Sequence, residues 1–259
     1  MSVLYAGSLV DVVEKQLAPG FHAATGYTLD GVPGGSSALA SEIKAKVRRG
    51  DVFISASRSV NATLEGAADG GWVSWYATFA RSPLVLGYNP SSRFASAIRS
   101  EPWYQVLTKP GILVGRTDPA TDPKGKLTVT ALDDAASLYH RPGLVRLADA
   151  PSNVFPEETL VGRLQAGQLD AGFFYSSETT AASLPSVPVS LPGRSLDATY
   201  TVTVLSGAPD LAGAEAFVSY LLGPQGRAIL GKDGFEVVRP PVVSGGAVPS
   251  ALRKALAGH

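Results

Sequence analysis

The chain has 259 residues, 45% of them hydrophobic, and its 22 basic and 22 acidic residues give a formal net charge of zero. This length suits one large or two small domains. The balanced charge, without runs of one sign, argues against nucleic acids and anionic membrane surfaces as partners. The absence of cysteine excludes thiol catalysis, disulfides and thiolate metal sites, and no apolar run reaches the roughly 18 residues that a membrane span needs.

The N-terminal third is predicted to alternate strands with amphipathic helices. Apolar residues after position 8 recur at helical spacing, at Leu9, Val12, Val13 and Leu17. We expect strands at 3–6, 27–31 and 51–55 and helices at 9–18, 37–48 and 59–67. This βαβαβ order implies a parallel sheet covered on both faces. No secretion signal precedes the strand pattern, and the abrupt start favours a truncated signal segment.

The remainder of the chain is predicted to build a second α/β unit and then return to the first. We expect strands at 83–88, 112–115, 171–175 and 199–205, a short helix around Trp103 and Leu107, helices at 128–138, 157–166 and 213–222, and a further helix opened by Pro224. Residues 118–125 and the segment 183–196, rich in proline and serine, are predicted to be loops.

Two strand-like crossings, near 80–88 and 197–205, divide the chain. We expect one lobe from residues 1–80 and 201–259 and a second from 81–200. A two-lobed α/β protein of this kind places its ligand in the cleft, at the carboxyl ends of strands.

Two serines open predicted helices. Ser8 follows Tyr5-Ala6-Gly7, and Ser36 follows Gly34-Gly35. The free amides at a helix start, with the positive end of the helix dipole, can bind a small oxoanion. The simpler interpretation is that both serines are ordinary caps, with Ser8 and Asp11 as a variant of the capping box.

A series of short motifs gives the chain a family resemblance over almost its full length. They are Ala6-Gly7-Ser8-Leu9, Gly35-Ser36-Ser37-Ala38, Gly50-Asp51-Val52, Phe79-Ala80, Trp103-Tyr104, Asp122-Pro123 with Gly125, and Gly167-Gln168-Leu169-Asp170 leading to Phe174-Tyr175. In order and spacing, the chain resembles the molybdate/tungstate-binding proteins of ABC importers, which have the two-lobed type II periplasmic binding protein fold.

The resemblance implies a function and a set of ligand-binding residues. The protein would bind tungstate or molybdate outside the cytoplasm, as a monomer without a cofactor, and deliver it to an ABC permease. Ser8 and Ser36 would bind the oxoanion from the first lobe, and Asp122, Glu157 and Tyr175 from the second. The resemblance leaves two positions open: the adjacent Ser37 could take the role of Ser36, and the adjacent Glu158 that of Glu157.

Carboxylates facing a dianion need a chemical reason, since like charges repel in a poorly solvated site. Molybdenum(VI) and tungsten(VI) are hard centres that can expand from four to six oxygens, so Asp122 and Glu157 could coordinate the metal and disfavour sulfate and phosphate. One carboxyl could instead be protonated and donate a hydrogen bond. Both acids could also be structural, at a turn and at a helix start.

The same sequence features also bear on alternative functions. The fold could serve sulfate, phosphate or an organic acid. An enzyme is disfavoured because the sequence lacks G-x-S-x-G, H-E-x-x-H, Walker and dinucleotide motifs. Arg116 could clamp an anion or pair with an acid such as Asp118.

Overall fold

The computed structural model describes residues 1–246 and 248–257 and divides into two compact units. Unit 1 consists of Met1–Arg81 and Thr199–His259, and unit 2 of Ser82–Ala198. Strands β4 (Trp75–Tyr88) and β8 (Asp197–Val204) each begin in one unit and end in the other. Each unit has a sheet with helices on both faces, so the α/β prediction is confirmed for each.

The sheet of unit 1 is built on a buried first strand. Strand β1 (Ser2–Ala6) runs parallel to both β2 (Asp30–Gly34) and β3 (Val52–Ser55), as the predicted βαβαβ order requires. Strand β8 then pairs antiparallel with β3, and β9 (Glu236–Gly245) pairs antiparallel with the first part of β4. The returning segment therefore completes the sheet that the N-terminus begins.

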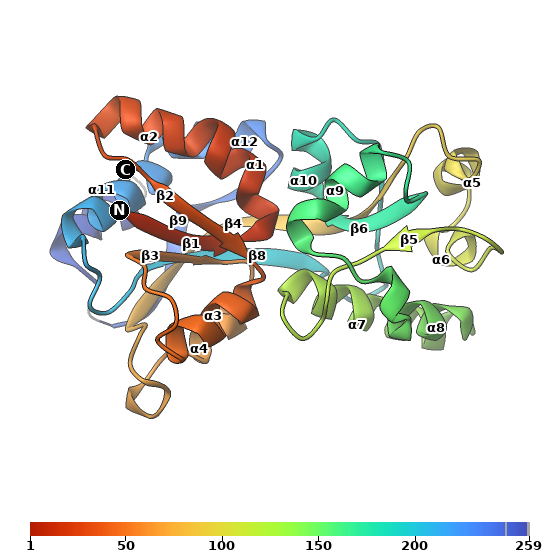
Figure 1. Cartoon of the computed structure of the whole chain (residues 1–259), viewed down its shortest axis with the longest axis horizontal. Helices are drawn as coiled ribbons and strands as arrows, with labels where there is room; N and C mark the ends of the chain where they lie inside the picture. The colour runs from red at the N-terminus through yellow and green to blue at the C-terminus, as the bar shows by residue number, and fades with distance from the viewer. Residues whose placement is uncertain (247, 258–259) are drawn as a thin grey trace. The chain divides into compact units, whose positions relative to one another are not determined.

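Helices cover both faces of this sheet. Figure 1 shows α1 and α2 on one side of β1 and β2 and α3 and α4 on the other. The helical elements of unit 1 are the 3-10 helix Gly7–Leu9, α1 (Val10–Val12), the π-helix Val13–Leu17, α2 (Ala18–Thr25), α3 (Ser36–Lys44), α4 (Arg58–Ala62), the 3-10 helix Ala67–Asp69, α11 (Leu211–Leu222), α12 (Pro224–Lys232), the 3-10 helix Ser250–Leu252 and α13 (Arg253–Leu256).

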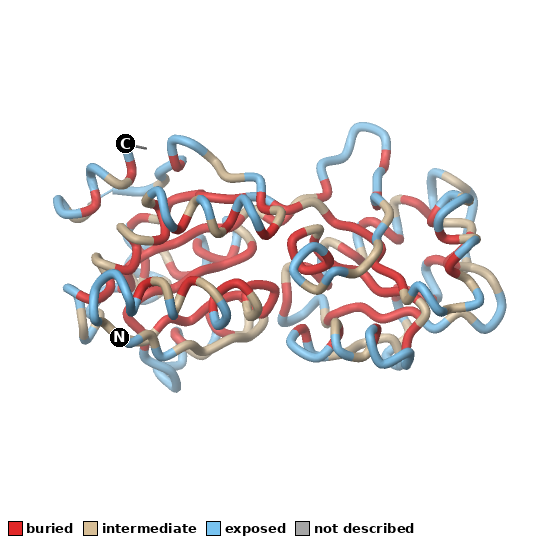
Figure 2. Tube along the Cα trace, turned by 90° about the horizontal axis from the view of Figure 1, so that it is seen from above, coloured by how far each residue is buried: buried red, intermediate tan, exposed pale blue. Residues whose placement is uncertain are grey.

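The core of unit 1 follows the hydrophobic pattern of the sequence. Leu39 and Ile43 lie on the buried face of α3 and pack with Leu4 of β1 and Phe53 of β3. The central strands β1, β3 and β8 are almost entirely buried and β2 and β9 are partly exposed, whereas the helices alternate between buried and exposed residues, as the changing colours of the tube in Figure 2 show. Burial of one apolar helix stripe against a sheet explains this alternation.

Unit 2 has a smaller sheet with the same layering. The second part of β4 pairs antiparallel with β6 (Ala171–Tyr175) and with β7 (Ser186–Pro188), and β5 (Val114–Gly115) is parallel to β6. Figure 1 shows α7 and α8 on one side of β6 and α9 and α10 on the other. The helices are α5 (Ala95–Ser100), α6 (Trp103–Val106), α7 (Pro123–Leu138), α8 (Gly143–Asp149), the 3-10 helix Pro151–Asn153, α9 (Glu157–Gln165) and α10 (Ser176–Ala181).

Several predicted boundaries are wrong. Strand β2 lies at Asp30–Gly34 rather than 27–31, and helix α4 ends at Ala62 rather than residue 67. Helix α7 begins inside the predicted loop 118–125, since Asp122 caps it and Pro123 occupies its first turn. Strand β7 lies within the predicted loop 183–196.

Several elements were not expected from the sequence, among them the helices α5, α8, α10 and α13 and the strand β9. Strand β9 contains the adjacent prolines Pro240 and Pro241, which are atypical of strands. Among the described residues, no helix has both the length and the apolar character to cross a membrane.

Candidate functional site

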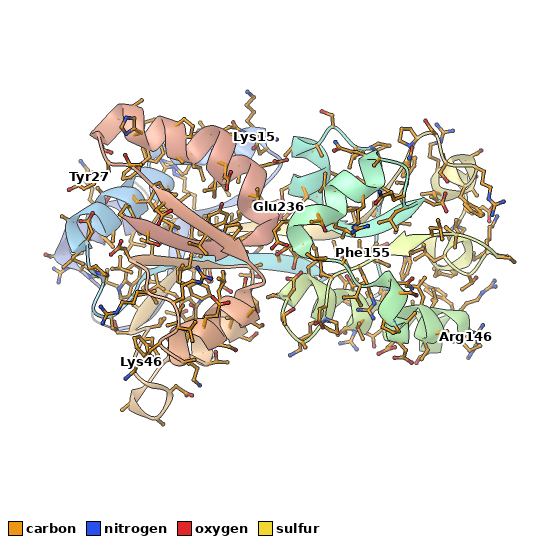
Figure 3. The ribbon with its side chains drawn as sticks, viewed as in Figure 1. Lys15, Tyr27, Lys46, Arg146, Phe155 and Glu236 are labelled. Atoms are coloured by element: carbon orange, nitrogen blue, oxygen red, sulfur yellow. The ribbon has the colours of Figure 1, made fainter. Side chains whose placement is uncertain are left out.

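Ser8 is buried in unit 1 but does not cap a helix. It lies inside the 3-10 helix Gly7–Leu9, whose N-cap is Ala6, and its side chain makes no capping hydrogen bond. Its Oγ is instead 2.9 Å from the hydroxyl of Tyr200 on β8. Asp11 forms an ion pair with Lys15 at 2.8 Å, and Lys15 is labelled in Figure 3. The capping-box interpretation of Ser8 and Asp11 is therefore wrong.

Ser36 is fully buried and is the first residue of α3. Gly35 is the N-cap, so the interpretation of Ser36 as a side-chain cap is also wrong. Ser36 Oγ accepts a 3.1 Å hydrogen bond from the backbone N–H of Ala56, which directly follows β3. A hydroxyl that accepts through oxygen can still donate its hydrogen to an anion. Ser37 is partly exposed, so burial distinguishes the two serines.

Asp122 of unit 2 is both a helix cap and a source of an unpaired oxygen. Its Oδ1 accepts a 3.0 Å hydrogen bond from the backbone N–H of Lys124. Gly125 allows this first turn to approach the preceding backbone, because a Cβ there would lie 2.6 Å from the carbonyl oxygen of Thr117. The other oxygen, Oδ2, is buried without a hydrogen bond within the described residues.

Glu157 is held near this turn by strand-like pairing. The N–H of Arg116 donates to Asn153 O at 2.8 Å, and the N–H of Phe155 donates to Arg116 O at 2.9 Å; Phe155 is labelled in Figure 3. Two residues later, Glu157 begins α9 with its side chain buried. Its neighbour Glu158 is exposed.

Both carboxylate oxygens of Glu157 are buried and make no hydrogen bond within the described residues. Oε1 lies 3.2 Å from Lys124 Nζ. The two groups are within ion-pair distance but do not meet the geometry of a hydrogen bond. Asp122 and Glu157 together therefore supply three of the four buried carboxylate oxygens that lack a hydrogen bond among the described residues of unit 2, the fourth being Asp134 Oδ2, 3.0 Å from Arg194 Nε. Buried polar atoms are almost always hydrogen-bonded, so such a group indicates a functional site.

Lys124 connects these residues and was not predicted from the sequence. Its side chain is 0% exposed, and Nζ lies 2.7 and 3.0 Å from the two carboxylate oxygens of Glu178. A lysine in the first turn of a helix is normally interpreted as solvated. The signal that could have identified it is its place inside the Asp-Pro-x-Gly turn.

Tyr175 ends β6 and is 1% exposed. Its backbone N–H donates to Glu178 Oε2 at 2.7 Å, which is one half of a capping box at the start of α10. Its ring centroid lies 5.6 Å from Lys124 Nζ. The structure therefore brings Asp122, Glu157 and Tyr175 around one lysine in unit 2.

The acids of this cluster are hard to ionise. Burial, assisted by Asp122 and Glu178 and opposed by Lys124, raises the pKa of Glu157 to about 8. Burial also raises the pKa of Asp122, while Lys124 lowers it. The Thr117 hydroxyl also lowers the pKa of Asp122, although neither Thr117 Oγ1 nor Asp122 Oδ2 makes a hydrogen bond of normal geometry within the described residues. For Lys124, burial alone would lower the pKa, but the three carboxylates raise it above its usual value.

Arg116 is buried and bonded to the backbone. Its Nη1 donates to Thr117 O at 3.1 Å, and its Nη2 donates to the carbonyl of Ala148 near the end of α8. The salt bridges found among the described residues do not include an Arg116–Asp118 pair. Asp118 accepts from the N–H of Ala120 and acts on Arg116 only as a nearby charge, which opposes the lowering of the Arg116 pKa by burial, so the alternative of a direct Arg116–Asp118 salt bridge is not what the described residues show.

Solved structures similar to this chain are binding proteins. The Azotobacter vinelandii periplasmic molybdate-binding protein aligns with a TM-score of 0.68 and 19% identity, over 92% of this chain and 100% of that one. The sulfate-binding protein SubI of Mycobacterium tuberculosis aligns with a TM-score of 0.65 and 16% identity, over 93% and 87%. At these identities the likeness concerns the fold, which is the type II periplasmic binding protein fold.

Sequence relatives cover most of the chain. A solute-binding protein of Petrotoga mobilis is 31% identical over 92% of this chain and 84% of its own length. A putative ABC transporter molybdenum-binding protein of Haloferax volcanii is 32% identical, over 89% and 69%. The molybdate/tungstate-binding protein WtpA of Thermococcus kodakarensis is 24% identical, over 70% and 65%.

The profile of one family matches residues 1–236. Its members are solute-binding proteins of transport systems that act outside the cytoplasm. This match covers both units. The chain belongs to the bacterial extracellular solute-binding protein family.

Proposed function

We propose that this protein binds tungstate or molybdate with high affinity and delivers the oxoanion to an ABC permease. In this proposal, the residues that bind the oxoanion are Ser8 and Ser36 in unit 1 and Asp122, Glu157 and Tyr175 in unit 2. The names of the Haloferax and Thermococcus relatives support the ligand class. The function is binding and delivery, without turnover.

The buried acids carry the proposal. Asp122 Oδ2 and both oxygens of Glu157 lack hydrogen bonds within the described residues. Leaving a buried polar atom without a hydrogen bond costs about 1–3 kcal/mol, so an ordinary core rarely retains several such oxygens in one cluster. A hard, highly charged metal centre with room for two more oxygen ligands accounts for this arrangement.

The bound centre would then have six oxygens, four from the oxoanion and two from Asp122 and Glu157. The two serines would bind the oxo groups as hydrogen-bond donors. Ser36 Oγ already accepts from Ala56, which leaves its hydrogen for an oxo group. Ser8 can donate in the same way when Tyr200 donates to its Oγ, since either hydroxyl can be the donor in that 2.9 Å contact.

A second candidate is a receptor for sulfate, a ligand named for one structural neighbour. Sulfur cannot take extra carboxylate ligands, so the Asp122–Glu157 pair in its ionised form would repel sulfate. The acid pair therefore favours a metalate over sulfate and phosphate.

Calorimetric titration of the protein with tungstate, molybdate, sulfate and phosphate tests the proposal. We expect the metalates to bind at least about a hundredfold more tightly than sulfate or phosphate, a difference of about 2.7 kcal/mol. Comparable affinity for sulfate would contradict the proposed ligand class. Absence of binding to all four anions would contradict an oxoanion receptor altogether.

A further inference from the structure

One buried residue, Lys124, contacts or positions every residue that we propose as a ligand in unit 2. The backbone N–H of Lys124 donates to Asp122 Oδ1 at 3.0 Å, and Oδ2 stays without a hydrogen bond among the described residues. The ammonium of the same residue lies 3.2 Å from Glu157 Oε1. Through Glu178 it also reaches Tyr175, whose N–H donates to Glu178 Oε2 at 2.7 Å.

The charges of the cluster make this cation necessary. Asp122, Glu157 and Glu178 are all buried, and Lys124 is the cation paired with two of them. Without the ammonium, Glu157 would keep no ion pair within the described residues and would face two other carboxylates. A buried acid that has lost its oppositely charged neighbour and faces two other acids would turn away from them.

We infer that Lys124 is a positioning residue of the binding site, which holds the Glu157 carboxylate in place for the metal centre and so contributes to selectivity for metalates. This inference rests on the proposed function. It differs from a purely structural role, in which Lys124 would only offset the charge of Glu178 and stabilise the fold.

A pair of substitutions separates the two roles. Lys124→Met removes the ammonium and keeps an apolar stem of similar length. Glu178→Gln removes the matching negative charge and keeps an oxygen that can accept the N–H of Tyr175. The double variant K124M/E178Q therefore keeps the summed charge of the cluster, and replacing a buried ion pair with uncharged groups is often tolerated. Its defined loss is the contact between Lys124 and Glu157.

The experiment compares the tungstate and sulfate dissociation constants of the parent, E178Q and K124M/E178Q, with the melting temperature of each. Lys126→Met is the matched control, because Lys126 lies on the same helix and is exposed. We expect the double variant to bind tungstate at least about tenfold more weakly than E178Q. We also expect a melting temperature close to that of E178Q and little change for sulfate.

The outcomes are distinguishable. A folded double variant that binds tungstate as tightly as E178Q would overturn the positioning role and leave the proposed function intact. Failure of the parent itself to bind tungstate or molybdate would overturn the proposed function and this inference with it. If K124M/E178Q does not fold, K124Q/E178Q, which keeps a donor at position 124, is compared with E178Q on the same criteria.

Discussion

Ser8 Oγ and the hydroxyl of Tyr200, 192 residues apart in the chain, lie 2.9 Å from each other in unit 1. Tyr200 is fully buried and packs against Phe79 and Phe235. The position of a candidate anion-binding hydroxyl is therefore fixed by a rigid aromatic side chain on the strand by which the chain returns to unit 1.

Ser8→Ala and Ser36→Ala should each weaken tungstate binding. A lost hydrogen bond to a charged group costs about 1.5–3 kcal/mol, or roughly ten- to hundredfold in the dissociation constant. Neither serine side chain caps a helix, but Ser36→Ala leaves the buried N–H of Ala56 unpaired, so we expect that variant to lose about 1–3 kcal/mol of stability as well. Ser37→Ala, at the partly exposed neighbouring position, is the control. Reduced stability with unchanged affinity would show that the two serines are structural only.

Asp122→Asn and Glu157→Gln should lower tungstate affinity and leave weak sulfate binding unchanged or slightly stronger. Each substitution removes an anionic ligand for the metal and a repulsive charge for sulfate; truncated buried charge pairs cost about 2–5 kcal/mol. Asparagine is as good an N-cap as aspartate, so Asp122→Asn preserves the start of α7. Glu158→Gln, at the exposed neighbouring residue, should have little effect. If Glu158→Gln carries the loss instead of Glu157→Gln, the register in α9 is wrong.

X-ray absorption on the tungstate complex should show a centre that is no longer tetrahedral. Six oxygen neighbours are expected when both carboxylates coordinate the metal. In the Asp122→Asn variant the coordination number should fall. A tetrahedral spectrum in the parent would mean that the acids act as neutral hydrogen-bond donors, the alternative consistent with a raised pKa.

The unliganded protein should become less stable as pH rises from about 4.5 to about 8. Glu157 has a pKa raised from 4.5 to about 8 in the folded chain, mainly by burial. Between these values the folded state holds a proton that the unfolded state has released, so the free energy of unfolding falls with increasing pH. Denaturant titrations across this range, with Glu157→Gln for comparison, check the slope. The variant should show a flatter profile, and equal slopes would contradict the assignment to Glu157.

Arg116→Met should destabilise unit 2 without changing the tungstate affinity of the folded protein. The guanidinium donates to the carbonyls of Thr117 and Ala148, and leaving buried carbonyls unpaired costs about 1–3 kcal/mol each. Melting temperature and calorimetry on the same sample distinguish this result from a role in anion binding. A selective loss of affinity would reinstate Arg116 as an anion clamp.

The positions of elements with a local residue pattern could be predicted from the sequence. Strands β1, β3 and β6 are continuous apolar runs, and α9 begins where an acidic pair follows Pro156, so these elements lie close to where they were expected. Strand β9 was missed because Pro240 and Pro241 disfavour a strand on local grounds, whereas pairing with β4 forms it through tertiary contacts.

The interactions within the candidate site depend on residues that are distant in sequence. Sequence reasoning selected Asp122, Glu157 and Tyr175, which unit 2 brings around Lys124. It missed Lys124 itself, because its burial depends on Glu178, 54 residues later. It also left capping open as the simpler role of Ser8 and Ser36, since a spacing pattern does not reveal that Tyr200 and Ala56 are their partners.

The antiparallel pairing of β3 with β8 has a consequence for the order of folding. The sheet of unit 1 requires residues from both ends of the chain, whereas unit 2 is the continuous segment Ser82–Ala198. During synthesis the whole of unit 2 leaves the ribosome before β8 is complete, and domains generally fold as units when their residues become available. Unit 2 can therefore form its native sheet first. In unit 1, β3 pairs with a strand about 150 residues downstream, and this long loop closure slows the folding of unit 1.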